Sequence, residues 1–281
     1  MKVFIVSDME GATGITHGDQ THAAGKDYER ARRWLTRDVN AAVLGAFDAG
    51  AQLVRVSDGH GTMRNLILDE LDPRAEVVLG CGLQRSVCQL ETLDETFGAV
   101  LCAGFHAKAG TPDGVLSHTW IGGVVREFVL GGRVVGETGI AAATAGALGV
   151  AVGMVAGDAA VCREARELLG DVETANVKTG LETLLAVCLH PEATGPLIRA
   201  AAKRAVETAA RRKPYRVPLP AEIVVRFNSG ALARQAAKNK GIELMDGDSV
   251  RIVRDSVREA VAAAWRVCYV AAIEQGAFPN W

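Results

Sequence analysis

The 281-residue chain has little of what marks a membrane, nucleic-acid-binding or secreted protein. Charged residues interrupt every apolar run before it reaches the roughly 18 residues that a membrane span needs. The formal net charge is only −2, so composition gives no argument for a nucleic-acid or membrane partner. The chain does not open with a basic segment, a long apolar stretch and a small-residue cleavage site, so we expect a cytoplasmic protein.

The motifs of several enzyme classes are also missing. Gly11 and Gly14 do not form a G-x-G-x-x-G pattern and no Lys-Ser/Thr pair follows, so neither dinucleotide nor P-loop binding is supported. No G-x-S-x-G elbow and no H-E-x-x-H pair occurs. The cysteines form no C-x-x-C pair, and most lie in apolar contexts, so we expect them to be reduced and structural. They are Cys81, Cys88, Cys102, Cys162, Cys188 and Cys268.

What the chain does contain is a regular alternation of strand and helix patterns. Strands are predicted over residues 3–6, 53–56, 76–79, 98–104, 124–130 and 150–155, and helices over 27–48, 137–148 and 158–169. This alternation predicts an α/β fold with a largely parallel sheet and flanking helices. After it come a helical pattern over 191–212, a proline-rich segment, and further strand and helix patterns. We therefore assign residues 1–190 to an α/β catalytic domain and residues 191–281 to a smaller α+β unit.

The first predicted strand ends in two carboxylates, Asp8 and Glu10. Side chains two apart on an extended chain point the same way, so both would face one spot at the carboxyl end of the strand. That end is where open α/β sheets bind their ligands. Two anions aimed at one place repel each other, which indicates a bound positive charge.

Other strand ends carry residues of the same kind. His60 follows the second strand, His106 follows the fourth, and Glu137 begins a helix. Taken singly, each has a plainer explanation as a turn, surface or helix-capping residue, and Asp58 fits a turn well. Taken together with Asp8 and Glu10, they form a nitrogen and oxygen set suited to zinc or a similar divalent metal. Five ligands exceed one open four-coordinate site, so a bridging carboxylate, most naturally Asp8, would let them hold two metals.

Three further histidines lie in loops. His118 could act as a general acid/base or hold a developing oxyanion, or it could be a loop histidine bonded to the backbone. His17 and His22 follow Glu10 in the chain and could also reach the site. Sequence leaves the roles of all three open.

At these residues the chain resembles the DppA-type D-aminopeptidases, a family of zinc peptidases. The matching segments come in the family's order and spacing, and they are residues 7–11, 27–30, 57–60, 104–107, 114–118, 136–137 and 155–158. The resemblance implies that Asp8, Glu10, His60, His106 and Glu137 hold two zinc ions, with Asp8 as the bridge. It implies a catalytic role for His118, and a ring-shaped decamer that cleaves N-terminal D-residues from short peptides. The chain departs from the family pattern at residues 16–24 and 178–181, which bears on the substrate more than on the metals.

The sequence therefore predicts a dinuclear zinc aminopeptidase acting on short peptides or amino-acid amides, with manganese or cobalt as other possible metals. Two alternatives stay open. One is a dinuclear metallohydrolase for a non-peptide amide or a phosphate ester, although phosphate sites usually recruit Arg or Lys, and Lys108 is the nearest candidate. The other is a non-catalytic binding protein, which would need no metal. Neither D- against L-specificity nor the oligomeric state follows from the sequence itself.

Overall fold

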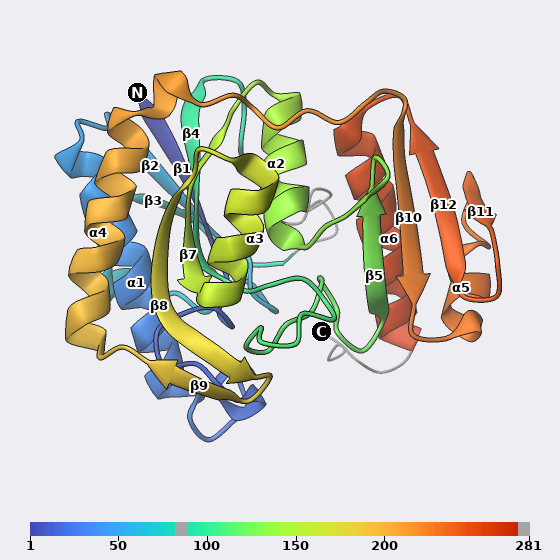
Figure 1. The fold of residues 1–281 in the computed structure, drawn as a ribbon, viewed down its shortest axis with the longest axis horizontal. Coiled ribbons are helices and arrows are strands. Elements are labelled where there is room, and N and C mark those ends of the chain that lie inside the picture. The colour runs from blue at the N-terminus through green and yellow to red at the C-terminus, as the bar shows by residue number, and fades with distance from the viewer. Residues whose placement is uncertain (82–88, 275–281) are drawn as a thin grey trace.

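The computed structural model describes residues 1–81 and 89–274 (Figure 1). Cys88 lies outside them, and Cys102, Cys162, Cys188 and Cys268 are reduced thiols. Two sheets organise the fold, a seven-stranded one in the order β3-β2-β1-β4-β7-β8-β9 and a five-stranded one in the order β11-β12-β10-β5-β6. In the described part of the chain, no helix is both long and apolar enough to cross a membrane.

The seven-stranded sheet is parallel except for its last strand, β9, which pairs antiparallel with β8. Its strands are β1 (Lys2–Ser7), β2 (Leu53–Asp58), β3 (Glu76–Val78), β4 (Phe97–Phe105), β7 (Val152–Asp158), β8 (Glu173–Glu182) and β9 (Leu185–Cys188). This confirms the predicted α/β class. The sequence patterns gave no strand over residues 173–188, so β8 and β9 were missed.

Helices cover both faces of this sheet because its central strands are apolar on both faces. Val3 and Ile5 of β1 pack with α1 (Tyr28–Asp48) and α4 (Pro191–Glu207). Phe4 and Val6 point the other way and pack with α2 (Glu137–Ala147) and α3 (Ala159–Leu169). Figure 1 shows α1 and α4 together on one side and α2 with α3 on the other.

The five-stranded sheet is antiparallel and lies beyond α2 (Figure 1). Its strands are β5 (Val125–Leu130), β6 (Arg133–Val134), β10 (Ala221–Phe227), β11 (Ile242–Leu244) and β12 (Ser249–Arg254), and its helices are α5 (Gly230–Ala236) and α6 (Val257–Glu274). The apolar core of this half joins β5, β10 and β12 to α6 and to Ile140 and Ala143 of α2. Packing through α2 therefore connects the second sheet to the first.

Three elements do not follow the expected boundary at residue 190. The strands β5 and β6, which precede it, pair into the second sheet through β10, whereas α4, which follows it, packs on α1 and the first sheet. The chain thus crosses between the sheets more than once. The division into domains 1–190 and 191–281 stays a prediction, and it does not coincide with the division between the two sheets.

Candidate metal centre

Three neighbouring strands bring the first candidate ligands together. The strands β2, β1 and β4 lie side by side and run parallel, so their carboxyl ends meet at one edge of the sheet. Asp8 follows β1, His60 follows β2, and His106 follows β4. The expected convergence of these strand ends is confirmed.

Asp8 lies between two of the histidines. Its Oδ1 is 3.2 Å from Nδ1 of His60, and its Oδ2 is 3.1 Å from Nε2 of His106. Oε2 of Glu10 lies 3.0 Å from the same His60 nitrogen. All four side chains are buried. One carboxylate whose two oxygens face different imidazoles has the arrangement that a bridging metal ligand needs.

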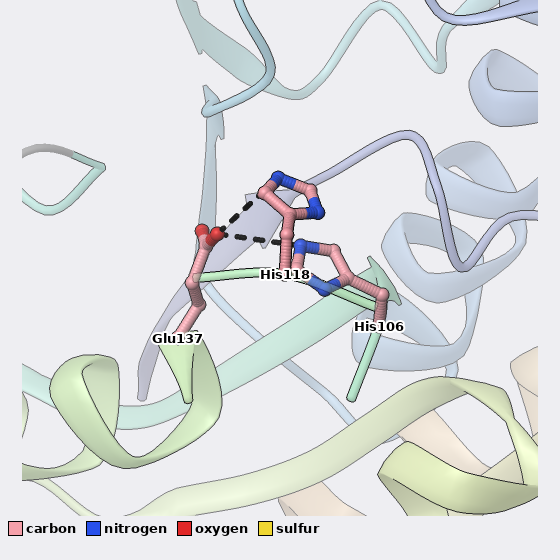
Figure 2. A group of neighbouring side chains, drawn as sticks. All are labelled: His106, His118 and Glu137. Atoms are coloured by element: carbon pink, nitrogen blue, oxygen red, sulfur yellow. Dashed lines mark ion pairs between the residues drawn. The ribbon is translucent and has the colours of Figure 1, made fainter. Parts of the chain in front are cut away.

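Glu137 extends the group on the far side of His106. It is the first residue of α2, and its Oε1 lies 3.3 Å from Nε2 of His106 and 3.9 Å from Nε2 of His118. The two imidazole rings stack, with centroids 4.0 Å apart and planes inclined by 10°. Figure 2 shows both rings beside the Glu137 carboxylate at the start of the helix.

Each of the three imidazoles is anchored at one nitrogen and faces carboxylates with the other. The anchored pairs are His60 Nε2 with the Thr21 carbonyl at 2.8 Å, His106 Nδ1 with the Ala107 carbonyl at 3.0 Å, and His118 Nδ1 with the Leu116 carbonyl at 2.9 Å. A carbonyl only accepts, so in the neutral imidazole the anchored nitrogen donates and the other nitrogen keeps its lone pair for a metal. Metal-binding histidines are characteristically held in this way.

The donor set therefore fits a metal on evidence from the structure itself. Nε2 of His106 and Oε2 of Glu10 are buried and have no hydrogen-bond partner among the described residues, a condition that calls for an explanation. Asp8, Glu10 and His106 offer ligand atoms within 4.8 Å of one another, and so do His106, His118 and Glu137. Imidazole nitrogens with carboxylate oxygens are a typical ligand set for zinc.

The electrostatics of the group favour positive charge. Burial and the neighbouring Glu10 raise the pKa of Asp8, but the imidazoles of His106 and His60 beside it outweigh them, so its pKa lies below the ordinary value. Burial lowers the pKa of His60 and of His106, yet the carboxylates around them raise it well above the usual range. A divalent cation would satisfy the same carboxylates.

The loop that carries His60 is organised by Asp58, which the sequence favoured as a turn residue. The Asp58 carboxylate is fully buried and accepts hydrogen bonds from the backbone N–H of His60 at 3.3 Å and of Leu66 at 3.0 Å. It also accepts from the backbone and the side chain of Asn65, at 2.5 and 2.9 Å. The signal that was missed is the place of Asp58 at the end of a buried strand, where an unpaired carboxylate would be costly.

Glu137 is likewise held by groups that sequence patterns did not single out. Nε2 of Gln89 donates to its Oε2 at 2.9 Å, and the backbone N–H of Trp120 donates to its Oε1 at 2.8 Å. The second donor is a main-chain group, which no residue type reveals. These contacts fix the direction of a carboxylate that faces two histidines.

A cavity of about 540 Å³ opens onto the group, a size typical of small-molecule sites. The candidate ligands that line it are Asp8, Glu10, His60 and Glu137, together with His118. His22 also lines it, whereas His17 caps the short 3-10 helix η1 (Gly18–Gln20) by accepting from the Asp19 N–H at 3.2 Å. Of the two loop histidines, only His22 is thus found at the cavity wall.

Backbone strain is concentrated at the same wall. Among the described residues, three that are not glycine have a positive φ, namely Met63 at 56°, Leu116 at 51° and Trp120 at 58°. All three line the cavity. Left-handed backbone costs on the order of 1–3 kcal/mol per residue and tends to occur at functional sites. The strain therefore marks this cavity independently of the ligand-type residues.

Comparisons with known proteins agree with this geometry. A family model described as D-aminopeptidase, Peptidase_M55, matches residues 1–265. A D-aminopeptidase of Bacillus subtilis (strain 168) is 35% identical over 247 residues, which cover 88% of this chain and 89% of the relative. The solved structure of the Zn-dependent D-aminopeptidase DppA from Bacillus subtilis, described as a self-compartmentalizing protease, superposes with a TM-score of 0.92 at 34% identity, over 96% of this chain and 98% of that one.

Proposed function

Because the chain belongs to the D-aminopeptidase family Peptidase_M55, we propose that it is a dinuclear zinc enzyme that removes N-terminal D-residues from short peptides or amino-acid amides. Family membership establishes an aminopeptidase. The number of metals, the ligand set and the substrate are our proposal. Asp8, Glu10, His60, His106 and Glu137 are the proposed ligands, and manganese or cobalt would also accept them.

The position of Asp8 carries the proposal. Its two carboxylate oxygens face two different histidines, at 3.2 and 3.1 Å, with Glu10 on one side and Glu137 on the other. A single-metal site would leave part of this buried set without a partner. With Asp8 as a bridge, every residue of the set would have a metal to bind. The outer nitrogens of His60 and His106 contact the carbonyls of Thr21 and Ala107, which leaves their inner nitrogens available for the metals.

When bound, a zinc pair would supply a nucleophile at neutral pH and polarise the scissile carbonyl. The protein's own groups do the rest. None of the described residues that line the cavity is Arg or Lys, so no cationic side chain there repels the free amino group of a peptide's N-terminal residue, as exopeptidase action requires. His118 donates its Nδ1–H to Leu116, so its Nε2 is the atom that carries a proton to the leaving amine or hydrogen-bonds the tetrahedral oxyanion.

A phosphate ester is a poorer substrate for this cavity. None of the described residues that line it is Arg or Lys. Lys108, the nearest candidate from sequence, has its ammonium 3.6 Å from the Glu164 carboxylate instead. A phosphate ester would therefore find no cationic side chain among the described lining residues to add to the charge of the metals.

Hydrolysis of matched D- and L-alanyl peptides, measured together with the zinc content of the protein, tests the proposal. We expect release of the D-residue, about two zinc ions per chain if both sites fill, and loss of activity on chelation. Cleavage of the L-peptide alone would refute the proposed specificity for D-residues. A protein purified without chelators that holds no zinc and gains no activity on adding it would refute the metal mechanism.

We also propose that the chain forms a homo-oligomer, as the self-compartmentalizing relative implies, with a decamer as the expected form. The hairpin of β8 and β9 supports this proposal. It lies at the edge of the seven-stranded sheet and exposes five large apolar side chains, which are Leu181, Leu184, Leu185, Val187 and Leu189. An apolar edge strand in contact with water invites pairing with another chain.

Native mass spectrometry of the parent and of a Val187→Glu variant tests the assembly. Val187 is 62% exposed, so the variant should fold. The new carboxylate would be buried only when chains associate, and it should therefore disfavour assembly. We expect a decamer for the parent and smaller species for the variant. A monomeric parent would refute the proposed oligomer. A Val187→Glu variant that is still a decamer would show that this hairpin is not part of the interfaces.

A further inference from the structure

Lys178 is a buried cation outside the candidate ligand set. It lies in the middle of β8, and only 1% of its surface is exposed. Lysine is almost never buried to this extent unless its charge is paired. Its partners therefore indicate what it does.

All of those partners are main-chain oxygens of one loop. Nζ of Lys178 donates to the carbonyls of Glu10 at 2.5 Å, Ala12 at 2.8 Å and Ile15 at 2.5 Å. An ammonium has three N–H donors, and here each has an acceptor. One side chain from β8 thus gathers the loop that follows β1, more than 160 residues away in the chain.

The same loop is also held by β4. The N–H of Gly11 donates to the Gly104 carbonyl at 2.8 Å. A Cβ on Gly11 would lie only 1.6 Å from the carbonyl oxygen of Phe105, so the backbone here touches β4 directly. The peptide group that joins Glu10 to Gly11 is thus held at both ends, with its carbonyl bound by Lys178 and its N–H bound to β4.

The carboxylate of Glu10 has less support of its own. Its Oε2 lies 3.0 Å from Nδ1 of His60, but that nitrogen is also 3.2 Å from Oδ1 of Asp8, so it is not a partner of Glu10 alone. Oε2 forms no hydrogen bond within the described residues. The direction of this carboxylate is therefore set mainly by its backbone.

We infer that Lys178 is a positioning residue for the metal centre, which aims the Glu10 carboxylate by holding the Glu10 carbonyl and the loop beyond it. The inference rests on the proposed function, in which Glu10 is a zinc ligand. Lys178 touches neither substrate nor the candidate ligand atoms. It acts through the main chain of one ligand, as outer-shell partners act on the ligands of other metal sites.

Zinc affinity, measured by competition with a chromophoric chelator on full-length protein, tests this role. Lys178→Met keeps the length of the side chain and removes all three donors. We expect zinc binding to weaken by about 10- to 100-fold, the usual effect of losing an outer-shell partner. Parent-like affinity in a folded Lys178→Met protein would overturn the inference.

A double-mutant cycle separates positioning from general loop stability. In a Glu10→Gln background, Lys178→Met should have little further effect on zinc affinity, because Lys178 acts through Glu10. A full and additive loss in that background would overturn the inference. Asp38→Ala is the matched control, since Asp38 accepts from the N–H and hydroxyl of Thr13 in the same loop, at 2.8 and 2.9 Å, beyond Glu10. It should lower thermal stability while zinc affinity stays near that of the parent.

If Lys178→Met does not fold, the zinc affinity of Lys178→Arg tests the positioning role instead. Arginine keeps the charge, but its planar fork cannot direct donors at three converging carbonyls, so we expect weakened zinc binding. Parent-like affinity would overturn the inference. A parent that binds no zinc refutes the proposed function and this inference with it, whereas a parent and Lys178 variants that bind zinc equally refute the inference alone.

Discussion

Asp8 is the residue whose replacement should change the metal content most. In Asp8→Asn, an NH₂ group replaces one carboxylate oxygen, and an amide nitrogen that donates hydrogen bonds is no metal ligand. Because the oxygens of Asp8 face both His60 and His106, we expect loss of much of the zinc and not merely slower turnover. Elemental analysis of the purified variant measures this.

The matched control for that variant is Asp113→Asn. The side chain of Asp113 is 42% exposed and pairs with Arg163 at 2.8 Å, whereas Asp8 is buried. It should keep the parent's zinc content. If Asp8→Asn also kept it, the assignment of Asp8 as a bridge would be wrong.

His118→Ala separates a catalytic role from a ligand role. We expect both zinc ions to stay and the rate of D-peptide hydrolysis to fall on the order of 10²–10³, the effect of losing one transition-state donor. Steady-state kinetics with zinc analysis measures both quantities. Full activity would exclude the catalytic role, and loss of zinc would make His118 a ligand, since its Nε2 lies 3.9 Å from Glu137.

The sequence predicted candidate ligands that do lie together in the structure, but not the residues that support them. Asp8, His60 and His106 were identifiable because a polar residue directly after a buried strand is conspicuous, and they do lie together. Gln89 was not, because a lone glutamine has no pattern. Lys178 was missed for a physical reason, since a lysine within a strand normally faces water and only its burial reveals otherwise.

At the scale of elements, the apolar runs of the central strands predicted most of the first sheet. The hairpin of β8 (Glu173–Glu182) and β9 (Leu185–Cys188) was not predicted, because β8 alternates between apolar and polar only over residues 175–178 and β9 has only four residues. One of its strands is largely exposed on both faces, a pattern that contact with another chain would explain. The placement of β5 and β6 in the second sheet was equally out of reach, because strand pairing over long separations leaves no local pattern.

Asp158 joins two elements and should matter to both. It caps α3, with Oδ1 accepting from the Val161 N–H at 2.8 Å, while Oδ2 accepts from the Val115 N–H at 2.7 Å in the loop that leads to His118. We expect Asp158→Ala to cost about 1–2 kcal/mol of unfolding free energy, and to slow catalysis by loosening that loop. Urea unfolding and kinetics measure the two effects.

Ser229→Ala is the control for this variant. Ser229 caps α5, a helix that packs on the second sheet. Its replacement should lower stability slightly and leave activity unchanged. Equal losses of activity in the two variants would contradict a specific link between Asp158 and the His118 loop.

At the scale of the whole molecule, Asp38 should make stability depend on pH. Burial raises its pKa to about 6 from the ordinary value of 3.8, despite the hydrogen bonds from Thr13. The folded state therefore binds this proton more tightly than the unfolded state, so the stabilising contribution is complete below pH 3.8 and is lost as the pH rises through about 6.

Asp38→Asn should remove that dependence. Its amide oxygen can still accept from the Thr13 N–H, and we expect the variant to gain stability over the parent at pH 7, on the order of 1–3 kcal/mol. Chemical unfolding at pH 4 to 7 provides the comparison. If the unfolding free energy of the variant changed with pH as steeply as that of the parent, the assignment would be wrong.

The reach of Lys178 across the sheet also bears on how the protein is made. The carboxylates of the first strand leave the ribosome early, but His106 follows them by about a hundred residues and Lys178 by more than 160. Contacts over such separations form late, because long loops must close first. If these residues form the metal centre as we propose, a nascent chain cannot complete it before Lys178 has been synthesised, and metal capture would come late in the maturation of this enzyme.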